Sequence, residues 1–195
     1  MARFAGVDVG GRGKGFHVAL LDGDGVELFS SVKPREVVAW LAERGPEVVA
    51  VDSPVDAARK GRVRRKGERR LARTVCGIRF TPDMKTMEAR KDGYYDWILN
   101  GFRLYKRLER AGRDNGWEVI ECFPTASWTR WAGARGRRSR ADWSGEALAT
   151  LGLHGVPPRT NQDVRDAVAA ALTARLHAEG ATERFGRIVV PVANP

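Results

Sequence analysis

The sequence has no long apolar segments and few cysteines. No apolar run approaches the ~20 residues of a membrane-spanning helix, so we expect no membrane association. Asp8 interrupts the early apolar run, which leaves no core for a secretory signal. The two cysteines, Cys76 and Cys122, lack metal-ligand spacing and suit a reducing compartment. The composition therefore predicts a cytoplasmic protein whose cysteines are free thiols.

Acidic residues are also scarce relative to basic ones. The 195 residues include 34 Lys and Arg against 24 Asp and Glu, a net charge of +10, and Arg outnumbers Lys 27 to 7. Such an excess points to a polyanionic partner, and guanidinium groups bind phosphate in a bidentate manner. GC-rich coding can also produce an arginine bias, so the distribution of charge is more informative than its total.

The positive charge gathers in two stretches, at about 59–73 and 130–143. The first carries nine basic residues against one acid, so self-repulsion favours an exposed loop or short helix. We interpret both stretches as basic insertions in a single domain spanning 1–195. Together with the glycine-rich turn after Asp8, they supply the candidate nucleic-acid contacts: Arg12, Lys14, Arg62, Arg64, Arg65, Arg69, Arg70, Arg137 and Arg138.

Apolar runs and turn residues predict an α/β fold. Strands are expected at 4–9, 16–22, 26–32, 47–52 and 116–124, the first three antiparallel because short turns join them. Residues 188–191 are a candidate final edge strand. A long amphipathic helix is expected from about 86 to 111, and another from the N-cap Asn161 to about 178. The pattern predicts a central mixed sheet of about five strands flanked by helices.

Four aspartates stand at unusual places in this pattern. Asp8 and Asp52 end apolar strands, whereas Asp163 and Asp166 lie three residues apart in the first turn of a helix and share one face. If the strands are parallel neighbours and the helix crosses their ends, the four carboxylates meet. A divalent cation would relieve their repulsion, and Mg²⁺ or Mn²⁺ suits such ligands. Glu121, also near a strand end, is a fifth catalytic candidate.

Each of these acids has a simpler explanation when taken singly. The helix dipole alone favours Asp163 in a first turn, and an aspartate before Ser-Pro, such as Asp52, is often a turn former. The three histidines, His17, His154 and His177, form no motif, and we interpret them as structural or surface residues.

The order of short motifs resembles a known family. The motifs Gly6-Val-Asp8, Val51-Asp52-Ser-Pro54, Glu121-Cys-Phe-Pro124 and Asp166-Ala-Val-Ala-Ala-Ala-Leu-Thr-Ala174 are similar to the family catalogued as domain of unknown function 429, whose members are described as predicted RNase H-like nucleases. The wider pattern resembles the RNase H-like superfamily, nearest its RuvC-type resolvase branch. The resemblance implies that Asp8, Asp52, Asp163 and Asp166 bind metal, with Glu121 in the Glu-x-x-Pro segment. One departure is Glu68, where the family is expected to carry an aspartate.

The resulting hypothesis is a Mg²⁺- or Mn²⁺-dependent nuclease that hydrolyses phosphodiester bonds in DNA or RNA. A first alternative is a nucleotide-binding phosphotransferase, because residues 8–15 resemble the first phosphate loop of actin-like kinases. The Gly-Lys pair lacks the following Ser or Thr of a Walker A motif, and the actin-like plan would need the chain to dimerise. A second alternative is a non-catalytic nucleic-acid-binding protein on the same fold. The sequence gives neither the oligomeric state nor the choice among DNA, RNA and branched substrates.

Overall fold

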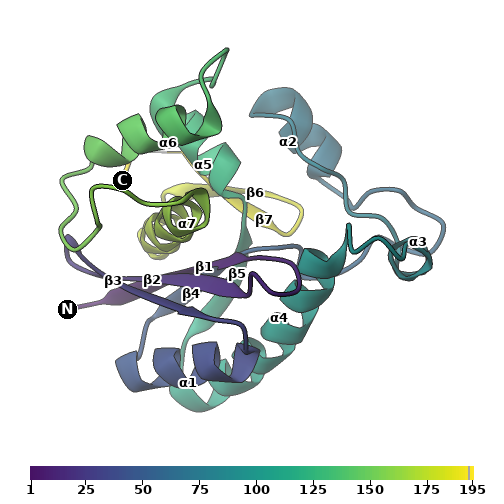
Figure 1. The fold of residues 1–195 in the computed structure, drawn as a ribbon, viewed down its shortest axis with the longest axis horizontal. Coiled ribbons are helices and arrows are strands. Elements are labelled where there is room, and N and C mark those ends of the chain that lie inside the picture. Colours follow the sequence, from purple (N-terminus) through teal and green to yellow (C-terminus); the bar gives the residue numbers. More distant parts are fainter. Residues whose placement is uncertain (193) are drawn as a thin grey trace.

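The computed structural model describes residues 1–192 and 194–195 as a mixed sheet with helices on both faces (Figure 1). Its strands are β1 (Arg3–Val9), β2 (Phe16–Asp22), β3 (Gly25–Ser31), β4 (Val48–Asp52), β5 (Glu118–Cys122), β6 (Thr182–Phe185) and β7 (Ile188–Pro191). Its helices are α1 (Pro34–Arg44), α2 (Glu68–Thr74), α3 (Met84–Ala89), α4 (Asp96–Asn115), α5 (Pro124–Ala132), α6 (Arg140–Ala149) and α7 (Gln162–Ala178).

The strands form one sheet in the order β3-β2-β1-β4-β5-β7-β6. The first three strands are antiparallel, whereas β4 pairs with β1 and β5 in parallel, and β7 continues the parallel part beside β5. This confirms the predicted mixed α/β arrangement, in which the first three strands are antiparallel.

Two details of the predicted fold are wrong. The described sheet has seven strands, and residues 188–191 form an inner strand because β6 pairs antiparallel along their outer side. The expected helix at 86–111 is two helices, α3 and α4, separated by a turn in which Gly93 has a positive φ of 74°. The first basic stretch contains the start of the short helix α2, in agreement with the predicted loop or short helix, and α6 begins inside the second stretch.

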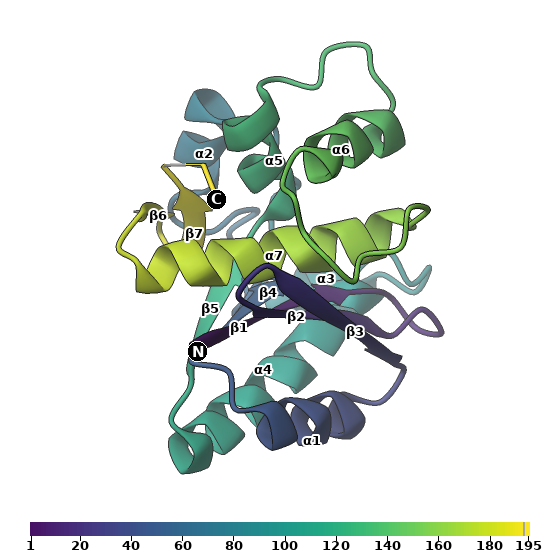
Figure 2. The same ribbon diagram turned by 90° about the vertical axis from the view of Figure 1, so that its left-hand side faces the viewer.

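Helix α7 crosses one face of the sheet, and α1 and α4 cover the other (Figures 1 and 2). Helices α5 and α6 pack on the outer side of α7. Side chains of β1 alternate between the faces: Phe4 packs with α7, whereas Ala5 and Val7 pack with α1 and α4. No helix in residues 1–192 and 194–195 is long and apolar enough to cross a membrane.

Helix α7 lies unusually close to the middle of β1. A Cβ atom added to Gly6 would lie 2.1 Å from both the carbonyl oxygen of Ala167 and the amide nitrogen of Ala171. Because those are backbone atoms, they cannot move aside as a flexible side chain would. The helix presents buried Ala167, Ala170 and Ala171 to the sheet. Glycine on the strand and alanines on the helix therefore permit the contact.

We expect Gly6→Ala to destabilise the fold by at least about 2 kcal/mol, because overpacking typically costs 1–3 kcal/mol and here the clash is with backbone. Gly145 in α6 is a matched control, since a Cβ there meets nothing within 4 Å. Gly145→Ala should stabilise by roughly 0.5–1 kcal/mol through helix propensity. Urea unfolding measures both. A Gly6→Ala variant as stable as the wild type would contradict this account of the α7 contact.

Candidate metal centre

Strand pairing brings Asp8 and Asp52 together. They are direct partners in the parallel register of β1 and β4, so their side chains leave the sheet side by side. They leave on the α7 face, because Phe4 on β1 and Val48 and Ala50 on β4 pack there. Asp52 is the last residue of β4 and Asp8 the last but one of β1, close to the predicted positions. The carboxyl ends of two parallel strands thus place two carboxylates under the first turn of α7.

Helix α7 adds Asp166 to this pair. Asn161 caps the helix as predicted, its side chain accepting a hydrogen bond from the Val164 amide at 2.8 Å. One carboxylate oxygen from each of Asp8, Asp52 and Asp166 lies within 4.8 Å of the others. Three carboxylates of the predicted set therefore meet at one point.

Three neighbours hold the Asp166 side chain. Trp128 Nε1 and Gln162 Nε2 donate hydrogen bonds to its Oδ1 at 3.1 and 2.9 Å. Arg140 donates to its Oδ2 at 2.7 Å from the start of α6. With Asp166 only 2% exposed, these contacts restrict the carboxylate to one orientation.

Asp8 and its neighbours carry more negative charge than the surrounding side chains balance. Burial, followed by the charges of Asp52, Asp166 and Asp163, raises the pKa of Asp8 from 3.8 to about 9. Burial and Asp166 also raise the pKa of Asp52 well above its usual value. Burial raises the pKa of Asp166, although the Arg140 guanidinium opposes the shift. The centre favours protons or a cation.

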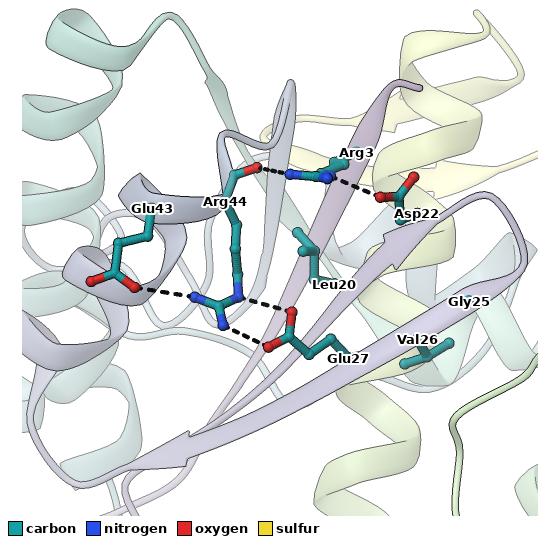
Figure 3. A pocket seen from close by; sticks show the side chains of 8 residues that line it. All are labelled: Arg3, Leu20, Asp22, Gly25, Val26, Glu27, Glu43 and Arg44. Atoms are coloured by element: carbon teal, nitrogen blue, oxygen red, sulfur yellow. Dashed lines mark hydrogen bonds and ion pairs between the residues drawn. The ribbon is translucent and has the colours of Figure 1, made fainter.

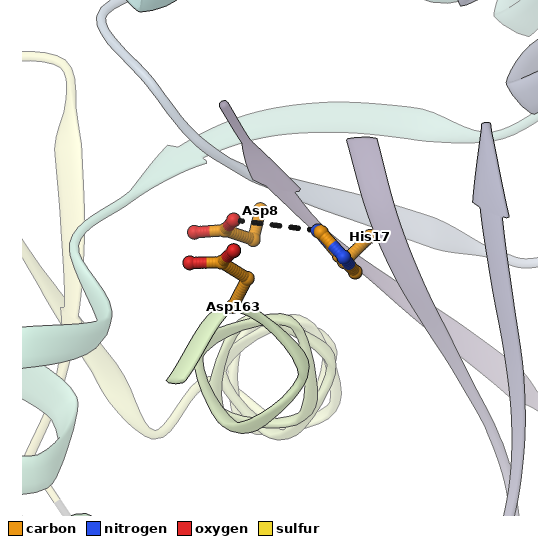
Figure 4. A group of neighbouring side chains, drawn as sticks. All are labelled: Asp8, His17 and Asp163. Atoms are coloured by element: carbon orange, nitrogen blue, oxygen red, sulfur yellow. Dashed lines mark ion pairs between the residues drawn. The ribbon is translucent and has the colours of Figure 1, made fainter. Parts of the chain in front are cut away.

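The fourth predicted ligand, Asp163, reaches Asp8 from the other side. Carboxylate oxygens of Asp8 and Asp163 and a ring nitrogen of His17 lie within 4.8 Å of one another (Figure 4). His17 is a correction to the sequence interpretation, which gave it no place near the acids. It stands opposite Asp8 in the antiparallel register of β1 and β2. The loop between these strands did not reveal that register in the sequence.

The two overlapping groups fit a divalent cation. Their donors are mostly carboxylate oxygens, which suit Mg²⁺ and Mn²⁺. In addition, the buried His17 Nδ1 has no hydrogen-bond partner among the described residues. A buried polar atom without a partner is uncommon and calls for an explanation such as an ion. Asp8, Asp52, Asp163 and Asp166 could all contact a bound metal, and Asp8 belongs to both groups.

Glu121 lies outside these groups. It pairs in register with Val51, on the opposite face from Asp52. Arg65 donates to Glu121 through both terminal nitrogens, at 2.7 Å from Nη1 to Oε2, and through its Nε to buried Glu68 at 2.9 Å. The backbone amide of Val55 also donates to Glu121. The structure thus gives Glu121, Glu68 and Arg65 one shared task, which is to tie the segment after β4 to the end of β5.

A pocket of about 680 Å³ opens beside the acids. Its lining includes Asp52 together with Arg79, Arg135 and Arg140. Arg140 and Arg135 come from the second basic stretch, whereas Arg79 follows α2. The sequence predicts a role in backbone binding for the stretch that holds Arg135 and Arg140, whereas Arg79 lies outside both basic stretches and no sequence signal marks it. Their shared pocket makes them the arginines best placed to bind a phosphate next to the carboxylates.

The predicted nucleic-acid contacts are spread over several surfaces. Arg62 and Arg64 line a separate hollow of about 950 Å³ with Arg187. Arg65 is occupied by the ion pair described above and is 7% exposed. Arg70 donates to the Arg184 carbonyl oxygen. The other predicted contacts, namely Arg12, Lys14, Arg69, Arg137 and Arg138, are exposed, with Arg12 3.6 Å from Asp96 and Arg138 3.4 Å from Glu146.

A further hollow of about 490 Å³ lies at the opposite end of β1 (Figure 3). Arg44 makes a bidentate pair with Glu27, at 2.9 and 2.6 Å, and Arg3 pairs with Asp22 at 2.9 Å. These charges balance one another at exposed positions. The hollow therefore lacks the uncompensated charge that marks the acidic centre.

The pKa of Asp8 predicts how stability changes with pH when metal is removed. The folded protein keeps a proton that the unfolded chain releases above pH 3.8. The free energy of unfolding should therefore decrease as the pH rises from about 4 to about 9, because only the unfolded chain gains the free energy of losing this proton. Asp8→Asn stays neutral, so its Tm should match that of the wild type near pH 4 and exceed it by a few °C at pH 8, where ~1 kcal/mol corresponds to roughly 2–4 °C.

Scanning calorimetry in a chelator across this pH range measures the difference. A Tm difference independent of pH would show that Asp8 does not titrate in this way. Asp114→Asn is the control, because Asp114 is exposed near the end of α4. Its Tm difference from the wild type should be small at every pH.

Comparison with known proteins gives a family and distant structural likenesses. No curated protein sequence matches the chain. Similar solved structures include T. thermophilus RuvC in complex with a Holliday junction substrate, at 16% identity and a TM-score of 0.46 over 92% of this chain and 96% of that chain. A structure of Thermus thermophilus RuvC has 19% identity and a TM-score of 0.44, over 91% of this chain and 96% of that chain. The yeast mitochondrial Holliday junction resolvase Ydc2 has 14% identity and a TM-score of 0.43, over 89% of this chain and 76% of that chain. The model of the family described as "Protein of unknown function (DUF429)" matches residues 6–188, and the chain belongs to this family.

Proposed function

We propose that this protein is a metal-dependent nuclease that hydrolyses phosphodiester bonds of DNA or RNA. The observation that carries the proposal is the meeting of Asp8, Asp52 and Asp166, with carboxylate oxygens within 4.8 Å of one another. Buried like charges of this kind are unfavourable without a cation. The pocket of about 680 Å³ beside them supplies the arginines that a phosphate substrate needs.

Asp8, Asp52 and Asp166 would hold Mg²⁺ or Mn²⁺, with Asp163 on the other side of Asp8. A divalent ion bound there supplies an activated water and stabilises charge on the leaving oxygen. Arg140 has two tasks, since it donates to Asp166 Oδ2 and also lines the pocket. It thereby keeps Asp166 aligned at the point where the phosphate would enter.

Arg79 and Arg135 would bind the phosphate backbone. Guanidinium groups match phosphate oxygens in a bidentate manner. Contacts to phosphate set the register of a nucleic acid but do not read its bases. The proposed activity therefore has weak sequence preference. The exposed Arg62 and Arg64, around the separate hollow, would extend the grip along a longer substrate.

The geometry of the loop between β1 and β2 weakens the phosphotransferase alternative. The Gly10 amide donates to the Gly15 carbonyl oxygen at 2.8 Å, and the Lys14 amide to the Gly11 carbonyl oxygen at 3.2 Å. Amides used within the loop are not available to cradle a phosphate. The non-catalytic alternative differs from the nuclease in one measurable respect, which is cleavage in the presence of metal.

We expect Asp52→Asn and Asp166→Asn each to lower cleavage at least about 100-fold, because a metal-stabilised transition state loses several kcal/mol and each 1.36 kcal/mol is tenfold in rate. Nucleic-acid binding should persist or tighten, since each change removes a negative charge. The assay uses single-stranded, duplex, hybrid and branched substrates with Mg²⁺, Mn²⁺ or chelator. The control is again Asp114→Asn, which should cleave as the wild type does.

Two results would overturn the proposal. If the wild type cleaves nothing on this panel with either metal, the protein is not a nuclease of this kind. If Asp52→Asn and Asp166→Asn both cleave at the wild-type rate, the acids are structural and the active site lies elsewhere.

The pocket arginines give a second prediction. Replacing Arg79 and Arg135 together with glutamine should weaken binding similarly on all sequences. The slope of log affinity against log salt should fall by roughly 0.7–0.9 per lost phosphate contact. The matched control is Arg107→Gln with Arg113→Gln, two exposed arginines of α4, on the other face of the sheet. An equal loss of slope in both double variants would mean that the pocket has no special part in binding.

A further inference from the structure

Asp8, His17 and Asp163 form a group that differs in chemistry from the all-carboxylate group. His17 comes from β2, Asp8 from β1 and Asp163 from the first turn of α7. The two carboxylates lie side by side, and the His17 ring lies next to Asp8 (Figure 4). Their ligand atoms lie within 4.8 Å of one another. Three elements distant in sequence thus deliver an imidazole and two carboxylates to one point.

One ring nitrogen of His17 lacks the hydrogen bond that a buried structural histidine usually makes. Its Nδ1 is buried and has no hydrogen-bond partner among the described residues. The nearest charged atom is Asp8 Oδ2 at 4.0 Å, beyond the range of a hydrogen bond. The His17 side chain as a whole is 17% exposed. Leaving a buried polar atom unpaired is unfavourable, so its lone pair or proton needs a partner.

The carboxylates of Asp8 and Asp163 also lack a Lys or Arg partner among the described residues. Arg140 pairs with Asp166, which is not a member of this group. No described residue makes a hydrogen bond or ion pair to the Asp163 carboxylate. Within the part of the chain that the structure describes, no Lys or Arg pairs with Asp8 or Asp163, and the His17 Nδ1 lies 4.0 Å from Asp8 Oδ2. A metal ion satisfies all three at once, because it accepts lone pairs from oxygen and nitrogen alike.

We propose that Asp8, His17 and Asp163 form a second cation site in which His17 is a direct ligand, and that this site prefers a first-row transition metal to Mg²⁺. Imidazole nitrogen is a softer donor than carboxylate oxygen, and Mg²⁺ strongly favours oxygen. The two halves of the centre then differ in metal preference. The half that contains Asp52 binds Mg²⁺ or Mn²⁺, whereas the half that contains His17 prefers a transition metal because of its nitrogen ligand. This inference deepens the proposed function and rests on it for its part in catalysis, because Asp8 belongs to both groups.

The test uses the full-length protein, stripped of metal by a chelator and loaded with Mn²⁺. Electron spin echo modulation detects a ¹⁴N nucleus bound directly to Mn²⁺, which reports His17 without any activity measurement. The wild type should show imidazole ¹⁴N coupling at saturating Mn²⁺. His17→Gln should lose the coupling, keep the ion on the Asp52 side and bind the second ion on the order of 10–100-fold more weakly. Competition by Mg²⁺ should displace the second ion more easily from His17→Gln than from the wild type.

Two further variants complete the design. His154→Gln is the matched control, because His154 is exposed, and it should keep the coupling. Asp163→Asn leaves His17 in place and should also lose the second ion. It decides the matter if His17→Gln fails to fold, which circular dichroism would show.

The inference is wrong if the wild type shows no ¹⁴N coupling at saturating Mn²⁺, or if the coupling survives in His17→Gln. In that case His17 is a histidine packed beside Asp8, with no bond to metal. These outcomes are separate from the fate of the proposed function. Cleavage without ¹⁴N coupling keeps the nuclease and removes His17 from the metal, whereas ¹⁴N coupling without cleavage keeps the metal site and removes the nuclease.

Discussion

Helix α7 lies against strand β1 with no side chain between them at Gly6, where an added Cβ would come within 2.1 Å of helix backbone. The acidic centre depends on this contact. Asp8 is two residues beyond Gly6 on the same face of β1, and Asp166 is one residue before Ala167 on α7. A helix held farther from the sheet by a larger side chain would carry Asp163 and Asp166 away from Asp8. Packing therefore holds together charges that would otherwise separate.

The structure contains two sets of buried acids, and they differ in how their charge is balanced. Glu121 and Glu68 share the Arg65 guanidinium, and backbone amides of Val55 and Thr81 donate to them as well. That network is satisfied within the protein, so it stabilises a local conformation. At the acidic centre, Arg140 pairs with Asp166, and burial with neighbouring negative charge raises the pKa of Asp8 to about 9. Both sets are buried, so it is the shortage of positive charge that marks the second set as the candidate functional site.

Strong local patterns allowed much of the fold to be predicted from sequence. Apolar runs and short turns predict β1 to β5, and Asn161 with its small-residue face predicts α7 close to where it lies. The positions of Asp8 and Asp52 at strand ends, with Asp166 on that helix, predict the meeting of the acids. Strand β6, with the sequence Thr-Glu-Arg-Phe, has no clear apolar alternation, and pairing with β7 defines it. The position of His17 beside Asp8 depends on the register between β1 and β2, which the loop sequence does not reveal. The separation of Glu121 from the acids depends on the face of β5 that it occupies, which the sequence does not reveal either.

Arginines and acidic residues lie next to each other at the candidate centre. Their opposite charges would couple the binding of the two proposed ligands, a divalent cation and a phosphate. Arg79, Arg135 and Arg140 would attract a phosphate to the pocket, while an ionised Asp52 in the same lining would repel it. A divalent cation on the carboxylates would cancel the repulsion and leave the arginine field in place. Metal would then strengthen substrate binding, and substrate would strengthen metal binding by the same factor, because coupling between two sites is reciprocal. An acidic centre beside arginines would thus make each ligand favour the binding of the other, so the proposed hydrolysis would occur mainly in protein that holds both.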